Sequence, residues 1–223
     1  MRMRKKPFAR PELESCSFFI QEPCRYRGQW RTQFRDPEAP LYLELGCGKG
    51  SFIAQLASQE RAANFVAVDI KDEMLVMAKR NLERAFAPDP VENVRILSWN
   101  IEQLEEMLAP EDGIAGIYIN FCNPWPKAKH HKHRLTYPRQ LAMYARLMRP
   151  GAQLAFKTDD DDLFQATRRY LDEAGWEVLF LSEDFRKKAF EGNLQTEHEA
   201  MFLCEGKTIK GLIARPRGAE ADA

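Results

Sequence analysis

Residues 41–50 read LYLELGCGKG, and these ten residues are the main evidence for the fold class. The apolar run at 41–45 has the length of a buried strand, and glycines then stand at alternate positions as Gly46, Gly48 and Gly50. Helical spacing follows at once over 51–58, so the stretch predicts a strand, a tight turn and a helix. Glycine permits such a turn and lets a ligand approach the main chain.

A second apolar run over 64–69 ends in Asp69, nineteen residues after Gly50. A carboxylate at the end of a buried strand can accept two hydrogen bonds from the hydroxyls of a ribose. A glycine turn alone is a weak signal, because many strand-to-helix turns use glycine. The turn and the acid together favour a nucleoside cofactor over a purely structural turn.

Strand and helix patterns alternate through the rest of the chain. We predict further strands at 93–97, 114–120, 152–157, 176–181 and 200–204, helices at 71–86 and 137–147, and shorter helices near 104–108 and from 159 onward. Such alternation predicts an α/β, Rossmann-like fold with a mostly parallel seven-stranded sheet and helices on both faces. Ligands are then expected beyond the carboxyl ends of the strands.

Composition and charge place limits on the class of protein. The 223 residues are 44% apolar, and 33 basic residues balance 33 acidic ones, which argues against a nonspecific cationic nucleic-acid binder. Residues 1–40 carry nine Lys or Arg against five acids, and five prolines. We predict an irregular N-terminal basic arm at 1–40, a catalytic domain at 41–215 and a flexible tail at 216–223.

Five scattered cysteines without a Cys-x-x-Cys pair argue against a disulfide framework or a zinc ribbon and predict a cytoplasmic protein. No apolar run approaches the length of a membrane span, so no membrane association is expected.

The most specific stretch follows the predicted strand at 114–120 and reads NFCNPWPKAKHHKHRL over 120–135. Prolines flank Trp125 and stiffen the loop, so the indole can form a wall against a flat base. The following run of Lys, His and Arg contains no acid and offers phosphate contacts. Taken alone, Trp125 would more often be a core aromatic. No metal is expected here, because the lysines beside the histidines repel cations.

Acidic residues follow the predicted strand at 152–157 and recur near the C-terminus. Asp159 is nearest the strand end and could face a substrate, whereas Asp160 to Asp162 fit a helix cap. The polar stretch Thr196–Glu197–His198–Glu199 offers carboxylates that can accept hydrogen bonds from the N1–H and N2–H₂ edge of guanine. Taken alone, these acids would more often be surface residues.

Together these motifs resemble a known enzyme family. The Gly-x-Gly-x-Gly turn with its leading acid, Glu44, is similar to the first motif of class I S-adenosylmethionine-dependent methyltransferases. The whole set, with the basic N-terminus MRMRKKP and the motif FKTD at 156–159, resembles the bacterial tRNA (guanine-N7-)-methyltransferase (TrmB) family across nearly the full chain. The resemblance implies S-adenosylmethionine as cofactor, tRNA as partner and N7-methylguanosine at guanosine 46 of the variable loop as product.

The resemblance also assigns roles by position. It places Asn123 at the catalytic position. It implies cofactor contacts from Glu44, Gly46, Gly48, Gly50, Asp69, Asn100 and Asn123, substrate contacts from Lys127, Asp159, Thr196, Glu197, His198 and Glu199, and RNA contacts from Lys129, His130, His131, Lys132, His133 and Arg134. Asn100 alone would more often be a helix N-cap. No obligate protein partner is expected, and the chain would act as a monomer or a homodimer.

The sequence departs from the family pattern in three ways. Asn123 stands where the family usually has a catalytic Asp, Lys129 and His133 stand in an arginine-rich run, and His198 replaces an aromatic residue. Guanine N7 carries a lone pair and no proton, so its attack on the cofactor methyl needs no general base. Our hypothesis is therefore an active enzyme in which Asn123 orients the reactants and Asp159 or Glu199 supplies negative charge.

Two alternatives stay open. The Asn-Pro-Trp sequence at 123–125 resembles the Asn-Pro-Pro-aromatic loop of exocyclic-amine methyltransferases, which would make the target N6 of adenine or N2 of guanine. The loss of the usual Asp also fits a catalytically weak relative that only binds RNA.

Overall fold

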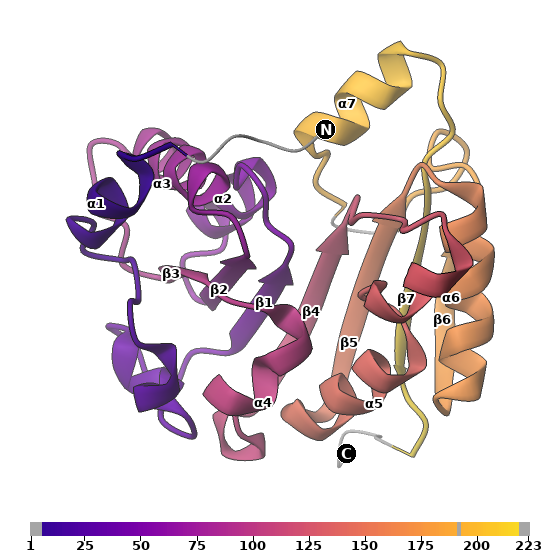
Figure 1. Cartoon of the computed structure of the whole chain (residues 1–223), viewed down its shortest axis with the longest axis horizontal. Coiled ribbons are helices and arrows are strands. Elements are labelled where there is room, and N and C mark those ends of the chain that lie inside the picture. Colours follow the sequence, from indigo (N-terminus) through magenta and orange to yellow (C-terminus); the bar gives the residue numbers. More distant parts are fainter. Residues whose placement is uncertain (1–5, 191–192, 219–223) are drawn as a thin grey trace.

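The computed structural model describes residues 6–190 and 193–218, apart from the side chains of residues 197 and 198. Seven strands form one sheet in the order β3-β2-β1-β4-β5-β7-β6 (Figure 1). All neighbours are parallel except for β7, which runs antiparallel to β5 and β6. The strands are β1 (Leu41–Leu45), β2 (Asn64–Asp69), β3 (Val94–Ser98), β4 (Ile114–Asn120), β5 (Met148–Thr158), β6 (Trp176–Ser182) and β7 (Lys210–Pro216). The prediction of a mostly parallel seven-stranded sheet is confirmed.

Helices pack on both faces of this sheet (Figure 1). The chain contains α1 (Ala9–Glu14), α2 (Ser51–Gln59), α3 (Asp72–Phe86), α4 (Leu104–Met107), α5 (Pro138–Leu147), α6 (Asp161–Glu173) and α7 (Glu197–Cys204). Successive side chains of β2 point to opposite faces, as they must in an extended strand. Phe65 and Ala67 join a core with α1, α2 and α3, whereas Val66 and Val68 join a core with α4, α5 and α6. Because β2 is buried on both sides, its sequence is a continuous apolar run.

The N-terminal segment is more ordered than the sequence predicted. It contains α1 and two 3₁₀ turns, η1 (Pro23–Tyr26) and η2 (Trp30–Gln33). Trp30 is fully buried, and its indole N–H donates to the carbonyl of Met107 over 2.7 Å. The Asp112 carboxylate accepts hydrogen bonds from the backbone N–H groups of Gly28 and Trp30. The segment therefore packs against the sheet domain, and its prolines do not prevent it from contributing to the core. The boundaries at 40 and 215 stay a prediction.

The prediction of a final strand at 200–204 is wrong. These residues lie in α7, and the last strand is β7. The apolar run there is too short to separate a strand from a helix by periodicity. The local signal that decides is the cap, because Thr196 Oγ1 accepts the backbone N–H of Glu199. Of the tail predicted at 216–223, Pro216 ends β7, and residues 219–223 lie outside the described part of the chain.

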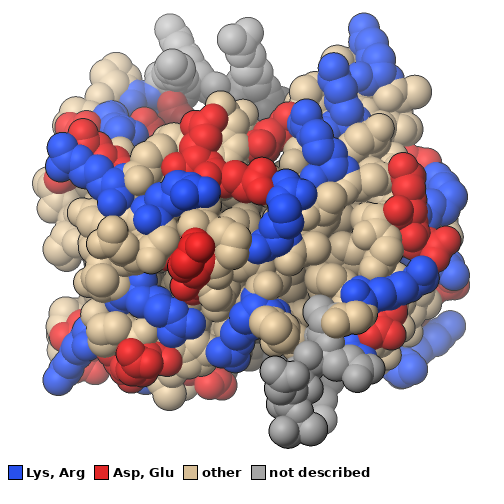
Figure 2. Space-filling view, turned by 90° about the horizontal axis from the view of Figure 1, so that it is seen from below, with Lys and Arg blue, Asp and Glu red and all other residues tan. Residues whose placement is uncertain are grey.

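Three further observations concern the cysteines, the helices and the surface charge. All five cysteines are free thiols, as predicted. Among the described residues, no helix has the length and apolar character needed to cross a membrane. Charge is mixed on the face that Figure 2 shows, where basic and acidic side chains alternate over the surface.

Candidate active site

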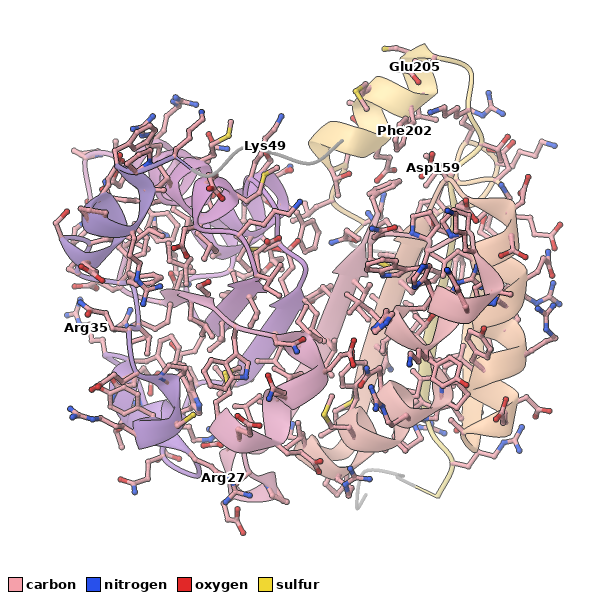
Figure 3. The ribbon with its side chains drawn as sticks, viewed as in Figure 1. Arg27, Arg35, Lys49, Asp159, Phe202 and Glu205 are labelled. Carbon is pink, nitrogen blue, oxygen red and sulfur yellow. The ribbon has the colours of Figure 1, made fainter. Side chains whose placement is uncertain are left out.

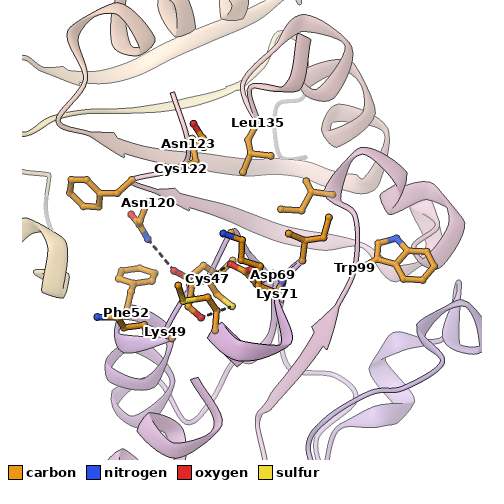
Figure 4. Close-up of a pocket in the computed structure, with 18 of the residues that line it drawn as sticks. Cys47, Lys49, Phe52, Asp69, Lys71, Trp99, Asn120, Cys122, Asn123 and Leu135 are labelled. Carbon is orange, nitrogen blue, oxygen red and sulfur yellow. Dashed lines mark hydrogen bonds between the residues drawn. The ribbon is translucent and has the colours of Figure 1, made fainter. Parts of the chain in front are cut away.

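A cavity of about 610 Å³ opens at the carboxyl ends of the central strands (Figure 4). The loops after β1, β2, β3 and β4 all contribute to its wall. The turn from Gly46 to Gly50 and the ring of Trp125 line this same cavity. Two stretches that lie far apart in the sequence thus share one pocket. A parallel sheet brings such loops together because all of them leave the same edge.

The glycine turn is built around the Asp69 carboxylate. Gly46, Gly48 and Gly50 all have positive φ angles, which an L side chain rarely adopts. The backbone N–H of Gly48 donates to Asp69 Oδ2 over 3.0 Å, and that of Lys71 donates to Oδ1 over 2.9 Å. Burial raises the pKa of Asp69, although these N–H donors oppose the shift. The acid thus holds the turn while it also faces the cavity.

Glu44 is a buried carboxyl in the wall of the cavity, with 3% of its surface exposed. Its Oε1 accepts a hydrogen bond from Asn120 Nδ2 at 3.5 Å, and its Oε2 has no partner among the described residues. Burial, reinforced by the charge of Asp69, raises the pKa of Glu44 to about 8. A buried carboxylate without a cation is costly, so this side chain is suited to a cationic ligand group.

Asn100 combines the two roles that its sequence position suggested. Its Oδ1 accepts the backbone N–H of Glu102 over 3.1 Å and so caps the 3₁₀ turn η3 (Ile101–Gln103). It also lines the cavity, between Trp99 and Ile101. The structural cap and a place in the wall are thus compatible.

The Trp125 loop is held in an unusual backbone conformation. Trp125 itself has a φ of 46°, in the left-handed region that non-glycine residues seldom adopt. Asn123 Oδ1 accepts the backbone N–H of Trp125 over 3.0 Å and stabilises this turn. The indole lies against the rings of His130 and His133, with centroids 5.8 and 5.4 Å away. Trp125 is therefore a half-buried wall residue and does not belong to the core.

The basic stretch after Trp125 forms the 3₁₀ segment η5 (Ala128–His133). Lys127, Lys129 and Lys132 are exposed and available to a polyanion. In the described part of the chain, no three His, Cys, Asp or Glu side chains gather as a metal site would require. His130 and His133 contact Trp125, and His133 also contacts Glu102.

Arg134 requires a correction. It was predicted to contact RNA, but it is completely buried. Its guanidinium donates to the carbonyl of Pro124 and to the carboxylate of Asp162. Because almost no part of the side chain reaches solvent, Arg134 supports the Trp125 loop from inside the protein in this structure.

The predicted substrate residues are distributed unevenly. Only Thr196 lines the cavity among those whose side chains are described. In the view of Figure 3, Asp159 lies below α7. Lys207 Nζ, from the segment after α7, approaches Asp159 Oδ2 at 3.8 Å. Glu199 is buried and bonded to Lys157 Nζ over 3.0 Å. Lys127 is exposed and is not part of the wall. Each of the two acids that we expected to supply negative charge therefore already has a lysine as an ion-pair partner.

Sequence reasoning missed a second set of residues in the wall. Asn120 is the last residue of β4, so the rule that ligands bind at strand ends could have found it. The apolar members gave no signal, because any core would use the same residue types. They are Ile70, Met74, Trp99, Phe121, Cys122 and Leu135.

Known proteins that are similar to this chain are methyltransferases, which agrees with the cavity at the glycine turn. The family model described as "Putative methyltransferase" matches residues 38–212. The tRNA (guanine-N(7)-)-methyltransferase of Clostridium beijerinckii is 49% identical over 96% of this chain and 98% of its own length. The enzyme of the same name from Acetivibrio thermocellus is 48% identical over 97% of this chain and its full length.

Solved structures show the same fold at low sequence identity. The 16S rRNA methyltransferase KamB has a TM-score of 0.59 and 19% identity, over 83% of this chain and 89% of its own. The antibiotic-resistance methyltransferase Kmr has a TM-score of 0.54 and 18% identity, with the same coverage. The sheet and its cavity thus define an α/β methyltransferase.

The long, close match to the bacterial enzymes is more specific. The chain belongs to the tRNA (guanine-N7-)-methyltransferase (TrmB) family.

Proposed function

We propose that the protein transfers a methyl group from S-adenosylmethionine to N7 of a guanosine in tRNA, at guanosine 46 of the variable loop. The observation that carries this proposal is the single cavity shared by the glycine turn and Trp125. A donor at the turn and a base against the indole would meet there. Family membership and the strand order support the finer assignment to the Rossmann-like class I methyltransferases.

The residues of the cavity fit this cofactor. The orphaned Oε2 of Glu44 is suited to the ammonium of the methionine part. Asp69, at the end of β2, is placed for the ribose hydroxyls, and Asn100 would line the adenine region. The three glycines keep side chains out of the turn that approaches the ligand.

Bound S-adenosylmethionine supplies a methyl group on a positively charged sulfonium. In the transfer, the N7 lone pair forms the new bond to carbon while the carbon–sulfur bond breaks, and no proton moves. The chain therefore has to align the reacting atoms, which can contribute about 7–11 kcal/mol to lowering the barrier. A stiff Trp125 loop and a preformed glycine turn are suited to that task.

Asn123 would orient the reactants in this scheme. Its amide already fixes the Trp125 turn, and it lies in the cavity wall. Asp159 and Glu199 are each engaged by a lysine, so neither of them is assigned the role of a free charge. The exposed lysines at 127, 129 and 132 would contact the tRNA backbone.

Nucleoside analysis of tRNA incubated with the protein and S-adenosylmethionine tests the proposal. We expect N7-methylguanosine, and we expect none when adenosine replaces guanosine 46. N6-methyladenosine or N2-methylguanosine would instead establish an exocyclic-amine methyltransferase. Intact cofactor binding with no methyl transfer to a susceptible tRNA would leave only the RNA-binding alternative.

A further inference from the structure

Lys157 is a lysine in the interior, with 2% of its side chain exposed. It lies at the carboxyl end of β5, beside the end of β4. Burial lowers the pKa of Lys157, and the nearby carboxylates of Glu199 and Glu44 oppose this shift. A charged side chain in such a position needs close partners, because an unpaired buried charge is strongly destabilising.

The partners of Lys157 come mainly from one segment, residues 183–199. The ammonium donates to the carbonyl of Leu194 over 2.8 Å and to Glu199 Oε2 over 3.0 Å. The rings of Phe185 and Phe190 surround it at 5.7 and 5.5 Å. One side chain of the sheet thus holds both the loop and the first turn of α7.

Lys157 is connected to the cavity wall through Glu199. Glu199, which bonds to Lys157 through its carboxylate, also donates its backbone N–H to Thr196 Oγ1 over 2.9 Å. Thr196 is part of the cavity wall. The position of Thr196 is therefore fixed from Lys157 through a single intervening residue.

The backbone of Lys157 also adjoins the cofactor end of the cavity. Asn120 is paired with Lys157 across the β4–β5 ladder, and its amide donates to Glu44. The backbone N–H of Phe121 donates to the carbonyl of Lys157 over 2.9 Å. The ends of β1, β4 and β5 thus place Glu44, Asn120 and Lys157 next to one another.

Lys157 itself does not face the main cavity. It borders a separate cavity of about 30 Å³, together with Phe52, Asn120 and Leu194. That volume holds about one or two water molecules and no purine base. Direct contact between Lys157 and a substrate base is thus excluded in this structure.

We propose that Lys157 is a positioning residue that holds the start of α7 over the methyl-transfer cavity, so that the segment from Thr196 to Glu199 meets the target guanine. The inference rests on the proposed function. It predicts that loss of the Lys157 side chain impairs use of tRNA and leaves cofactor binding intact, because the contacts of Lys157 with β4 are made by its backbone and Asp69 holds the glycine turn.

The test compares Lys157→Met with Lys187→Met. Lys187 lies in the same segment, but it is exposed and contributes only a surface ion pair with Asp184. For Lys157→Met we expect kcat/KM for tRNA to fall at least tenfold and limited proteolysis within 183–199 to accelerate. We expect the Kd for S-adenosylmethionine, measured by calorimetry, to stay within threefold of wild type. Lys187→Met should match the wild type in all three measurements.

A second variant covers the case in which Lys157→Met does not fold. Lys157→Gln removes the ammonium and retains a donor for the Leu194 carbonyl, so it should fold and show the same loss of kcat/KM for tRNA, with a Kd for S-adenosylmethionine within threefold of wild type. Wild-type kcat/KM for tRNA in a folded Lys157→Gln variant would overturn the inference. So would wild-type kcat and KM in Lys157→Met, or an equal loss of cofactor affinity and tRNA turnover. If the wild-type protein methylates no tRNA, the proposed function is refuted, and so is this inference, because it rests on that function.

Discussion

Nδ1 of His133 lies 2.7 Å from Oε1 of Glu102, and this contact joins the two halves of the cavity wall. Glu102 belongs to the turn that Asn100 caps, on the side proposed for adenine. His133 lies against Trp125, on the side proposed for the target base. Arg139 donates to the other carboxylate oxygen over 2.6 Å. One acid therefore ties the Trp125 loop to the loop after β3.

Replacing Glu102 with Gln should loosen this connection. Burial acts against ionisation of Glu102, but the hydrogen bonds from His133 and Arg139 prevail and lower its pKa. Stabilisation from a lowered pKa is present above the unfolded-state pKa and is lost as the pH falls through the folded-state pKa. We expect Glu102→Gln to cost up to about 1 kcal/mol at pH 7, since the pair is partly exposed. Thermal unfolding of the wild type and of Glu102→Gln from pH 7 to 3 measures the difference in stability. A difference that stays the same in acid would contradict the prediction.

Glu44 should show the opposite pH dependence. Its pKa is raised to about 8, so its contribution to stability is full below the unfolded-state pKa and is lost as the pH rises toward 8. Without cofactor, Glu44→Gln should be more stable than wild type at pH 8, by on the order of 3 kcal/mol. Chemical denaturation at pH 5 and pH 8 tests this. The exposed Glu60 provides a control, since Glu60→Gln should change neither value.

The same group makes a prediction about cofactor binding. If the ammonium of S-adenosylmethionine pairs with ionised Glu44, binding at pH 7 must release close to one proton, because the free carboxyl is mostly protonated. Calorimetry in buffers with different ionisation enthalpies counts that proton. Glu44→Gln should bind more weakly and release none. Unchanged proton release in this variant would assign the effect to another group.

Gly50 should tolerate no side chain. Its φ is +69°, and a Cβ there would lie 2.6 Å from Cβ and 2.8 Å from Cα of Ala78 in α3. We expect Gly50→Ala to destabilise the fold by more than the roughly 1–2 kcal/mol that the left-handed conformation alone costs. Gly175→Ala is the matched control, because Gly175 has a φ of +74° and a Cβ added there would meet no atom within 4 Å. Equal unfolding free energies for the two variants would show that contact with Ala78 is unimportant.

Restoring the usual family acid at position 123 should raise the rate. An Asp carboxylate can accept the Trp125 N–H as Asn123 does, so the loop should keep its shape. Negative charge near the purine as it becomes cationic would contribute about 2.7–4 kcal/mol at most, a factor of up to 10² to 10³ in rate. Asn123→Ala should instead lower the rate by removing the hydrogen bond. Single-turnover methyl transfer under saturating cofactor distinguishes the variants, and an Asp variant slower than wild type would refute this role.

In the basic stretch after Trp125, we expect Lys129 and Lys132 to bind tRNA electrostatically and Arg134 to support the fold. Lys129 and Lys132 are exposed, so replacing both with Ala should weaken tRNA binding and reduce the slope of log K against log salt by about 1.4 to 1.8. Arg134→Ala should mainly lower stability, because it removes a buried side chain and leaves the Pro124 carbonyl without its donor. Salt titrations of tRNA binding and thermal unfolding of each variant test the distinction. If Arg134→Ala keeps full stability but reduces the slope of log K against log salt, Arg134 contacts RNA as the sequence predicted.

Local sequence patterns were enough to predict six of the seven strands, the glycine turn, the acid at Asp69 and the Trp125 loop. Strand alternation, positive-φ glycines and proline-flanked aromatics each depend on a few neighbouring residues, so they can be recognised without coordinates. Ligands bind at the carboxyl ends of the strands in a parallel sheet, so the edge that holds the cavity could be predicted as well.

Which charged residues reach solvent could be seen only in the folded chain. Arg134 and Lys157 look like ordinary cations in the sequence, yet both are buried with partners that lie 28 and 42 residues away. The run at 200–204 became a helix because the N-cap at Thr196 outweighed a short apolar pattern. Burial and pairing depend on contacts between distant segments, and these contacts exist only once the chain has folded.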